Sequence, residues 1–177
     1  MGKKTSEIHI GTSGWSYKHW AGLFYPDDVK PAKYLEYYTS QFDCVELNSS
    51  FYHLPKAPTT EGWKVRTPAN FLFCPKLSRY ISHRLKLSHP EEALENFFEV
   101  IGIMHDRLGP VLIQLPPGLK YDRDKVDEFL RVLKSNYAEY RFAIEIRHQS
   151  WINDEFFESL SANDIAFVIA DSGKRYP

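Results

Sequence analysis

Hydrophobic and polar positions along the chain follow two repeats, short runs with the period of a strand and longer runs with the period of a helix. Strand-like segments lie near residues 8–12, 43–48, 71–76, 110–115, 141–147 and 165–170. Helical segments lie between them, near residues 31–41, 58–65, 90–107, 123–136 and 153–162. Such alternation predicts right-handed crossovers and a parallel sheet with helices packed outside it.

Two of the expected strands carry polar side chains on one face and apolar side chains on the other. In residues 141–147, Ala143, Glu145 and Arg147 share a face, and the aromatic and aliphatic residues between them share the opposite face. In residues 43–48, Cys44, Glu46 and Asn48 alternate with valine and leucine in the same way. Strands between two helix layers are apolar on both faces, whereas a barrel strand turns one face to a lumen whose upper layer is polar. The pattern favours a parallel (β/α) barrel of TIM type.

Length and composition indicate one domain over residues 1–177. The chain has 177 residues, is 43% hydrophobic and has a net charge of -1, which gives no overall attraction to nucleic acid or anionic lipid. No apolar run is long enough to cross a bilayer, and residues 1–6 lack the apolar core of a signal peptide. We therefore expect a soluble, cytoplasmic protein with no membrane partner.

The glycine and cysteine patterns give no sign of a cofactor. Residues 11–15 (GTSGW) lack the third glycine of a dinucleotide fingerprint and place a tryptophan where a pyrophosphate would approach. Cys44 and Cys74 lie in separate strands, which predicts reduced core thiols and neither a disulfide nor a zinc site. We predict no cofactor and no metal ligands.

Active sites of barrel enzymes lie at the carboxyl ends of the strands, so polar residues at those ends are the candidates. For proton transfer or nucleophilic attack they are Glu46, Lys76, Glu145 and His148. For substrate binding, polar and aromatic candidates follow the same strands: Thr12, Trp15, Tyr17, Asn48, Tyr52, Gln114, Arg147, Trp151 and Asp171.

Each candidate also has a structural interpretation. Glu145 and Arg147 would otherwise form an internal ion pair, Asn48 would cap a loop, and the aromatic residues would roof the barrel. A divalent metal held by Glu46, Glu145, His148 and Asp171 is an alternative that no short-spaced ligand motif supports.

Several long motifs in order give the chain a family resemblance. They are residues 10–17 (IGTSGWSY), 45–52 (VELNSSFY), 67–71 (TPANF), 81–83 (ISH) and 144–151 (IEIRHQSW). Over residues 8–171 the chain resembles the YecE-like family, domain of unknown function 72. The resemblance implies a TIM-type barrel with no established reaction. Family members continue past the sixth strand, whereas this sequence stops at Pro177 with about six of eight strands, so the barrel is expected to be incomplete or open.

Our leading hypothesis is an enzyme-like pocket of hydrolase or isomerase type for a small polar or anionic metabolite. Arg147 and Lys76 would hold its negative end, Glu46 and Glu145 would move protons or bind hydroxyls, and His148 would assist. The alternatives are a nucleic-acid- or protein-binding module that uses the aromatic loops with Arg79, His83, Arg84 and Lys86 at their edge, and a truncated chain without function. An open sheet edge also predicts self-association.

Overall fold

Six parallel strands form the centre of this computed structural model, which describes residues 7–171 and 173. The strands are arranged as two three-stranded sheets of order β1-β2-β3 and β4-β5-β6. Their bounds are β1 Gly11–Ser13, β2 Cys44–Leu47, β3 Leu72–Pro75, β4 Val111–Gln114, β5 Phe142–Glu145 and β6 Ala166–Phe167. The prediction of six parallel strands is confirmed, although each strand is shorter than its hydrophobic pattern indicated.

The two sheets meet between β3 and β4 without forming a continuous ladder. Isolated bridges pair Phe73 with Leu108 and Lys76 with Leu112. The backbone N–H of Leu77 donates to the Leu112 carbonyl at 2.8 Å. A closed barrel is not seen in the described residues, because β1 pairs with β2 alone and β6 with β5 alone. Both outer edges stay open, and self-association through them stays a prediction.

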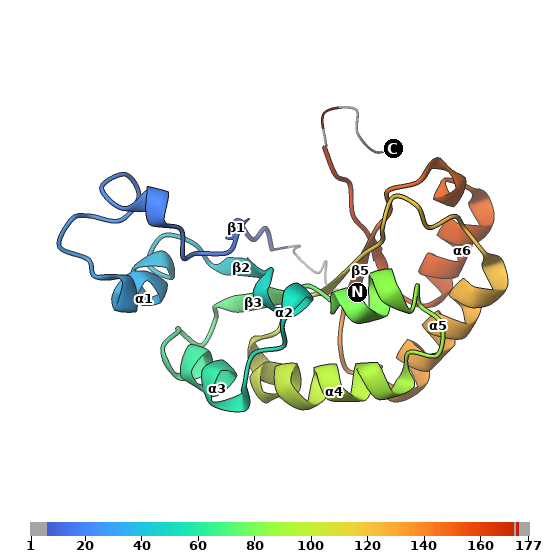
Figure 1. Cartoon of the computed structure of the whole chain (residues 1–177), viewed down its shortest axis with the longest axis horizontal. Coiled ribbons are helices and arrows are strands. Elements are labelled where there is room, and N and C mark those ends of the chain that lie inside the picture. Colours follow the sequence, from blue (N-terminus) through green and yellow to red (C-terminus); the bar gives the residue numbers. More distant parts are fainter. Residues whose placement is uncertain (1–6, 172, 174–177) are drawn as a thin grey trace, which may run out of the picture.

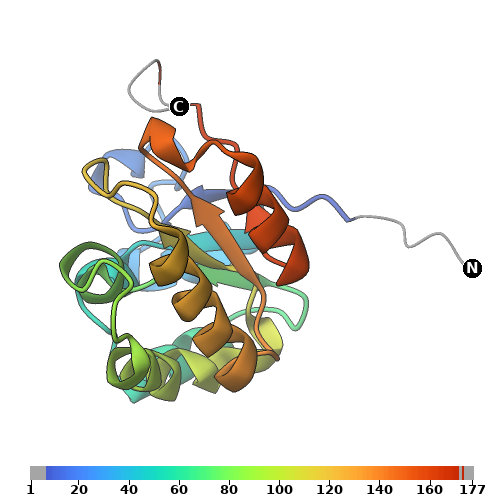
Figure 2. The ribbon, with the colours of Figure 1, turned by 90° about the vertical axis from the view of Figure 1, so that its right-hand side faces the viewer.

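Helices cover one side of the strands and leave the other side open (Figures 1 and 2). The α-helices are α1 Tyr34–Tyr38, α2 Ser49–Tyr52, α3 Ala57–Val65, α4 Glu91–Ile101, α5 Arg123–Asn136 and α6 Asp154–Ala162. Shorter turns are η1 Lys18–Trp20, η2 Pro31–Lys33, η3 Tyr80–Arg84, η4 Gly102–Arg107 and η5 Gln149–Trp151; η3 is a π-turn and the others are 3-10 turns.

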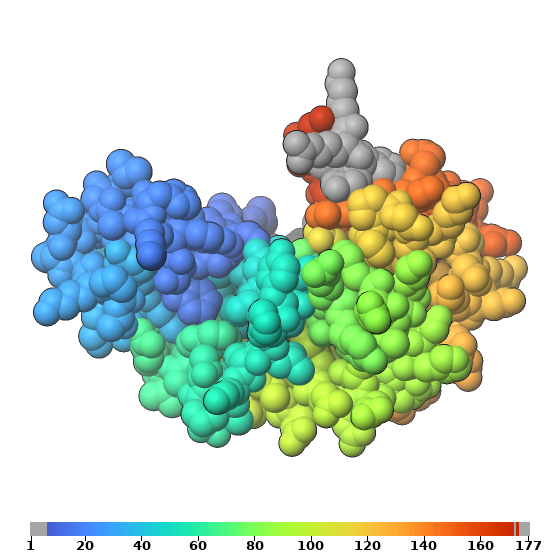
Figure 3. Space-filling view, in the orientation of Figure 1, coloured from blue at the N-terminus to red at the C-terminus, as the bar shows by residue number. Residues whose placement is uncertain are grey.

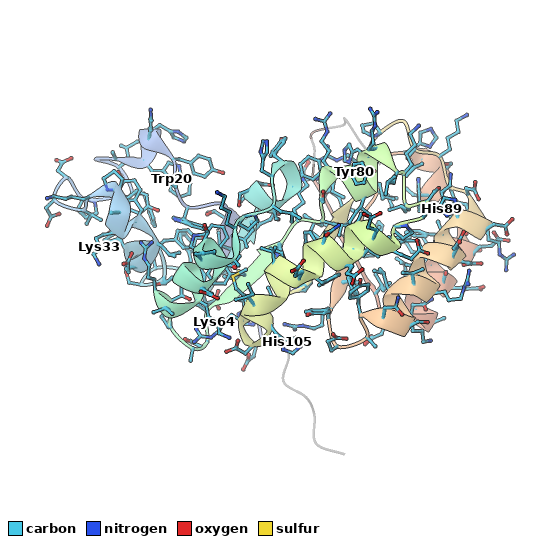
Figure 4. The ribbon with its side chains drawn as sticks, turned by 60° about the horizontal axis from the view of Figure 1, so that its bottom comes forward. Trp20, Lys33, Lys64, Tyr80, His89 and His105 are labelled. Carbon is cyan, nitrogen blue, oxygen red and sulfur yellow. The ribbon has the colours of Figure 1, made fainter. Side chains whose placement is uncertain are left out.

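Two of the predicted helices are divided in the structure. The helix expected over 90–107 ends at Ile101 and tightens into η4, where the Tyr140 hydroxyl oxygen would lie 2.8 Å from a Cβ at Gly102. The helix expected over 31–41 starts as η2 at Pro31 and ends at Tyr38. Lys64 of α3 contacts η4 by donating to the Ile103 carbonyl at 3.3 Å, and Figure 4 labels its place.

The four inner strands, β2 to β5, have one buried face and one partly exposed face. Val45, Phe73, Ile113 and Ile144 on the helix side are between 0% and 1% exposed. The opposite side is half-buried at its nonpolar positions, which are Cys44, Leu72, Cys74, Leu112 and Ala143. Alternation along the strands therefore has the predicted sense, and the molecule is hollowed on the side away from the helices, between its blue and orange parts (Figure 3).

Gly11 allows β1 to approach β2 closely. A Cβ atom at this position would lie 2.2 Å from the Cys44 carbonyl oxygen and 2.8 Å from the Cys44 sulfur. Such separations are far shorter than van der Waals contact. Glycine at residue 11 is therefore required for the pairing that places Ser13 beside Glu46.

An ion pair between Glu36 and Arg66 joins α1 to the end of α3, and it gives a prediction for acid stability. Arg66 donates to both carboxylate oxygens of Glu36, at 3.1 and 2.7 Å, and this holds the pKa of Glu36 at about 2 instead of 4.5. Because the folded-state pKa is depressed, the stabilisation is complete above pH 4.5 and is lost as the pH falls toward 2. Because both side chains are partly exposed, we expect the ion pair to contribute about 1 kcal/mol to the free energy of unfolding at neutral pH.

Urea unfolding of Glu36→Gln between pH 2 and pH 7 measures this contribution. The variant should be less stable than the wild type at pH 6 and equal to it near pH 2. Glu128→Gln is the control, because Glu128 is exposed on α5 and forms no ion pair within the described residues. A difference between Glu36→Gln and the wild type that does not change with pH would contradict the assignment.

Candidate functional site

Four polar side chains form a hydrogen-bonded chain across the carboxyl ends of β3, β4 and β5. The Lys76 Nζ donates to Gln114 Oε1 at 2.7 Å, and Gln114 Nε2 donates to Glu145 Oε2 at 2.7 Å. The Arg147 Nε donates to the other carboxylate oxygen, Glu145 Oε1, at 2.9 Å. All four were sequence candidates, and the structure brings them together; their roles are still predictions.

The strand register explains why these residues meet. Gln114 pairs with Glu145 at the last position of β4 and β5, and Lys76 follows directly after β3. Lys76, Gln114 and Glu145 are each 8% exposed. Burying charged groups to this degree costs several kcal/mol unless they are paired and hydrogen-bonded, and Gln114 supplies the link between the ammonium and the carboxylate.

The charged groups of the site act on the pKa of Lys76 in opposite directions. Burial lowers the pKa of its ammonium, and Arg147 lowers it further, while the negative charges of Glu46 and Glu145 act in the opposite direction. Both acids therefore act on the same amine. The ammonium also lies 4.5 Å from the centre of the Phe51 ring, in a cation–π contact from α2.

A second polar cluster lies beside it at the ends of β1 and β2. The Ser13 hydroxyl donates to Glu46 Oε1 at 2.8 Å and accepts a hydrogen bond from the Asn48 amide. The cluster borders a hollow of about 250 Å³ whose walls include Trp15 and Tyr17. The predicted first strand covers residues 8–12 and so leaves out Ser13, which is the last residue of β1. A predicted strand one residue longer would have included Ser13 among the candidates at strand ends.

The remaining sequence candidates do not join either cluster. The Thr12 hydroxyl oxygen lies 2.7 Å from the Gly14 carbonyl oxygen and 2.9 Å from the Tyr38 hydroxyl oxygen. His148 Nδ1 accepts from the Ser150 backbone N–H at 3.1 Å. Asp171 accepts from the Gly173 backbone N–H. These three side chains have local structural partners.

Two aromatic candidates also lie apart from these clusters. Trp151 is 1% exposed and lies in the core, whereas Tyr52 is 66% exposed and borders a different groove. A core ring at residue 151 cannot line a binding pocket in this conformation. Exposure leaves Tyr52 available to a ligand outside the site described above.

No group of three or more His, Cys, Asp or Glu side chains in the described residues could hold a metal ion. Glu46, Glu145, His148 and Asp171 therefore do not converge as the metal alternative required. Cys44 and Cys74 are both free thiols. Burial raises the pKa of Cys74 to about 12, so this thiol is protonated and unreactive at neutral pH.

A hollow at the amino-terminal ends of β1 and β2 has no comparable chemistry. It measures about 490 Å³, and Ile8, Ile10 and Phe71 are among its lining residues. Its carboxylate, Asp43, is engaged by His9 Nδ1 at 2.9 Å and by the Ile10 backbone N–H at 3.0 Å.

No helix in the described part of the chain is long and apolar enough to cross a membrane.

Comparison with known proteins finds one family. The model of the family described as "Protein of unknown function DUF72" matches residues 9–177. The UPF0759 protein YunF of Bacillus subtilis is 31% identical over 157 residues, which are 85% of this chain and 54% of YunF. The UPF0759 protein YecE of Escherichia coli is 30% identical over 80% of this chain and 48% of YecE. The chain thus spans about half the length of these relatives.

Solved structures of the same family have the same fold. A DUF72 family protein from Thermotoga maritima superposes with a TM-score of 0.79 at 36% identity, covering 92% of this chain and 64% of that one. A DUF72 family protein from Enterococcus faecalis gives a TM-score of 0.70 at 21% identity, over 92% of this chain and 62% of the other.

Proposed function

Because this chain belongs to the DUF72 family, for which no reaction is named, we propose a function from the site itself: binding of a small polar or anionic metabolite at the carboxyl ends of the strands. The observation that supports it most directly is the buried hydrogen-bonded chain from Lys76 to Arg147. Polar groups brought together at this end of a parallel sheet are typical of ligand sites.

Of the four hydrogen-bonded side chains, that of Arg147 is the one that a ligand would reach first. Its side chain is 25% exposed, whereas that of Glu145 is 11% exposed. A guanidinium is a planar, permanently charged donor whose geometry suits a carboxylate or phosphate oxygen. Lys76 adds a second positive charge behind it, so the negative end of the metabolite would lie near these two residues.

Glu46 and Glu145 would supply the proton-transfer groups of a hydrolase- or isomerase-type reaction. Glu46 lies beside the hollow with Trp15 and Tyr17, so the body of the metabolite would extend from Arg147 toward these aromatic walls. His148 would assist, with its Nδ1 held by hydrogen bonds to Ser150.

The proposal includes a TIM-type arrangement, in which the two sheets are adjacent parts of one barrel wall. Two observations support it. The bridges from Phe73 to Leu108 and from Lys76 to Leu112 continue the parallel order from β3 to β4. The polar side chains also face the side that a closed wall would enclose.

Binding of a panel of hydroxycarboxylates and sugar acids, followed by ligand-observed NMR, tests the proposal on the whole 177-residue chain. At least one compound should bind, and Lys76→Met should weaken it by 30-fold or more because the positive charge is lost while the side-chain volume is kept. Lys120→Met is the matched control, since Lys120 is exposed after β4.

Two outcomes would overturn the proposal: no compound binds, or Lys76→Met and Glu145→Gln leave every affinity unchanged. Either would favour a structural role, in which the same four side chains only tie β3 to β4 and β5.

A further inference from the structure

A separate groove lies between α2 and η3. It has a volume of about 530 Å³ and is lined by Phe51, Tyr52, Ser78, Arg79, Tyr80, His83 and Arg84. None of the four linked side chains lines it, and Phe51, which contacts Lys76, separates the two. The volume suits one small molecule.

The charge of this groove is positive and uncompensated. Arg79 and Arg84 are both exposed, and neither forms an ion pair or a side-chain hydrogen bond within residues 7–171. The lining contains no carboxylate. Most other arginines within residues 7–171 have an acidic or carbonyl partner, as Arg66, Arg107 and Arg123 do.

His83 lies in a positive field to which Arg79 of the groove contributes. Its pKa is lowered by burial first, and then by Arg79, Lys76 and Arg147. The ring is held by the Ser82 hydroxyl at 2.9 Å from Nδ1 and by an edge-on contact with Phe51. A neutral imidazole at the base of the groove therefore adds a polar contact without adding an acid.

Two tyrosine rings give the groove its flat apolar walls. Tyr52 comes from α2 and is 66% exposed, and Tyr80 comes from η3 and is 56% exposed. Figure 4 labels Tyr80 on its turn at the edge of the molecule. Exposed aromatic rings beside free guanidinium groups are suited to a ligand that has both a planar ring and a dianionic group.

We propose that this groove binds an aromatic phosphomonoester, of the class that includes nucleoside monophosphates. Arg79 and Arg84 hold the phosphate, which carries nearly two negative charges at neutral pH, and the ring packs against Tyr52 or Tyr80. A carboxylate has a single negative charge and would neutralise only one of the two guanidinium groups. Among the described residues, only these two arginines supply positive charge to the groove, and the net charge of the chain is -1, which favours a single small ligand over a long polyanion.

Isothermal titration of the whole chain with adenosine monophosphate, adenosine and inorganic phosphate tests this site. The monophosphate should bind at least 10-fold more tightly than either fragment. The double variant Arg79→Ala/Arg84→Ala should lower the affinity for the monophosphate by 30-fold or more. Tyr52→Leu/Tyr80→Leu should lower that affinity about 5-fold and leave the affinity for inorganic phosphate unchanged.

The matched control is Lys18→Ala/Arg131→Ala, which removes two positive charges from exposed positions elsewhere and should bind normally. Circular dichroism confirms that the variants are folded, as expected for exposed side chains. Three results would overturn the proposal. The first is equal affinity for monophosphate and adenosine, and the second is an unchanged affinity in Arg79→Ala/Arg84→Ala. The third is binding only of a single-stranded oligonucleotide with a steep salt dependence.

This test is independent of the proposed metabolite pocket. Lys76→Met should change the affinity for the monophosphate less than 3-fold, because the ammonium lies behind Phe51. Lys76→Met could instead abolish binding while Arg79→Ala/Arg84→Ala leaves it intact. The phosphate would then bind beside the hydrogen-bonded side chains from Lys76 to Arg147, and the groove proposal would be wrong.

Discussion

Replacing Trp151 with alanine is expected to lower the free energy of unfolding by about 4 kcal/mol. The indole is 1% exposed and makes edge-to-face contacts with Tyr121 and Phe156, at 5.4 and 5.2 Å between ring centres. Its Nε1 donates to the Leu119 carbonyl at 2.7 Å. Alanine would leave a large cavity and an unpaired buried carbonyl, which are both among the costliest effects of a single substitution.

Urea unfolding followed by far-ultraviolet circular dichroism measures this loss. Trp151→Phe keeps part of the packing and removes the N–H donor together with part of the ring, so it should cost less than alanine, about 2 kcal/mol. Tyr80→Ala, at an exposed ring, should stay within about 0.5 kcal/mol of the wild type. Near-normal stability of Trp151→Ala would show that the ring is not part of the core, and its predicted role in substrate binding would regain support.

The same experiment examines the alternative that the chain is a fragment without function. A single cooperative transition of the wild type would show that 177 residues suffice for a stable core. A broad, non-cooperative transition would instead agree with an incomplete barrel whose partly exposed sheet face lacks cover.

Replacing Glu145 with alanine is expected to cost about 3 kcal/mol at neutral pH. The carboxylate accepts hydrogen bonds from Gln114 and Arg147, and its charge opposes the lowering of the Lys76 pKa. Without it, the Gln114 amide loses a buried acceptor and the pKa of Lys76 falls further. Glu145→Gln keeps one acceptor oxygen but replaces the other with an NH2 group that faces a donor, so it should cost less than Glu145→Ala, about 2 kcal/mol.

The pH dependence separates the charge effect from simple loss of packing. Because the folded-state pKa of Lys76 is lowered, the folded protein gains stability relative to the unfolded chain as the pH rises through that pKa toward the usual lysine value. The cost of Glu145→Ala should therefore become smaller as the pH rises from 7 toward the usual lysine pKa, since deprotonation of Lys76 removes the charge that the carboxylate balances.

A double-mutant cycle supplies the control. In a Lys76→Met background, Glu145→Ala should cost at least 1 kcal/mol less than in the wild type. Equal costs in the two backgrounds, together with no dependence on pH, would show that Lys76 and Glu145 do not interact through Gln114.

Much of the candidate site was predictable because it depends on the two-residue period of strands. That period placed Glu145 and Arg147 on one face, and Gln114 and Lys76 at neighbouring strand ends. It could not show that Gln114 links the ammonium to the carboxylate, since Lys76 and Gln114 are 38 residues apart and belong to different sheets. Trp151 was placed in a binding loop because it follows a strand, but burial by α6 and residues near Tyr121 decides its position.

The sequence by itself determined the order of strands and helices, the polar and apolar faces of the strands, and the family. Those features follow from backbone geometry and from local alternation, which act over a few residues. Only the tertiary structure decided that the strands form two separate, open sheets and that Ser13 is hydrogen-bonded to Glu46. It also decided that Arg79, Arg84 and two tyrosines line one groove. Each of these depends on which distant segments pack side by side, and sheet register and loop packing are set by contacts across the whole chain.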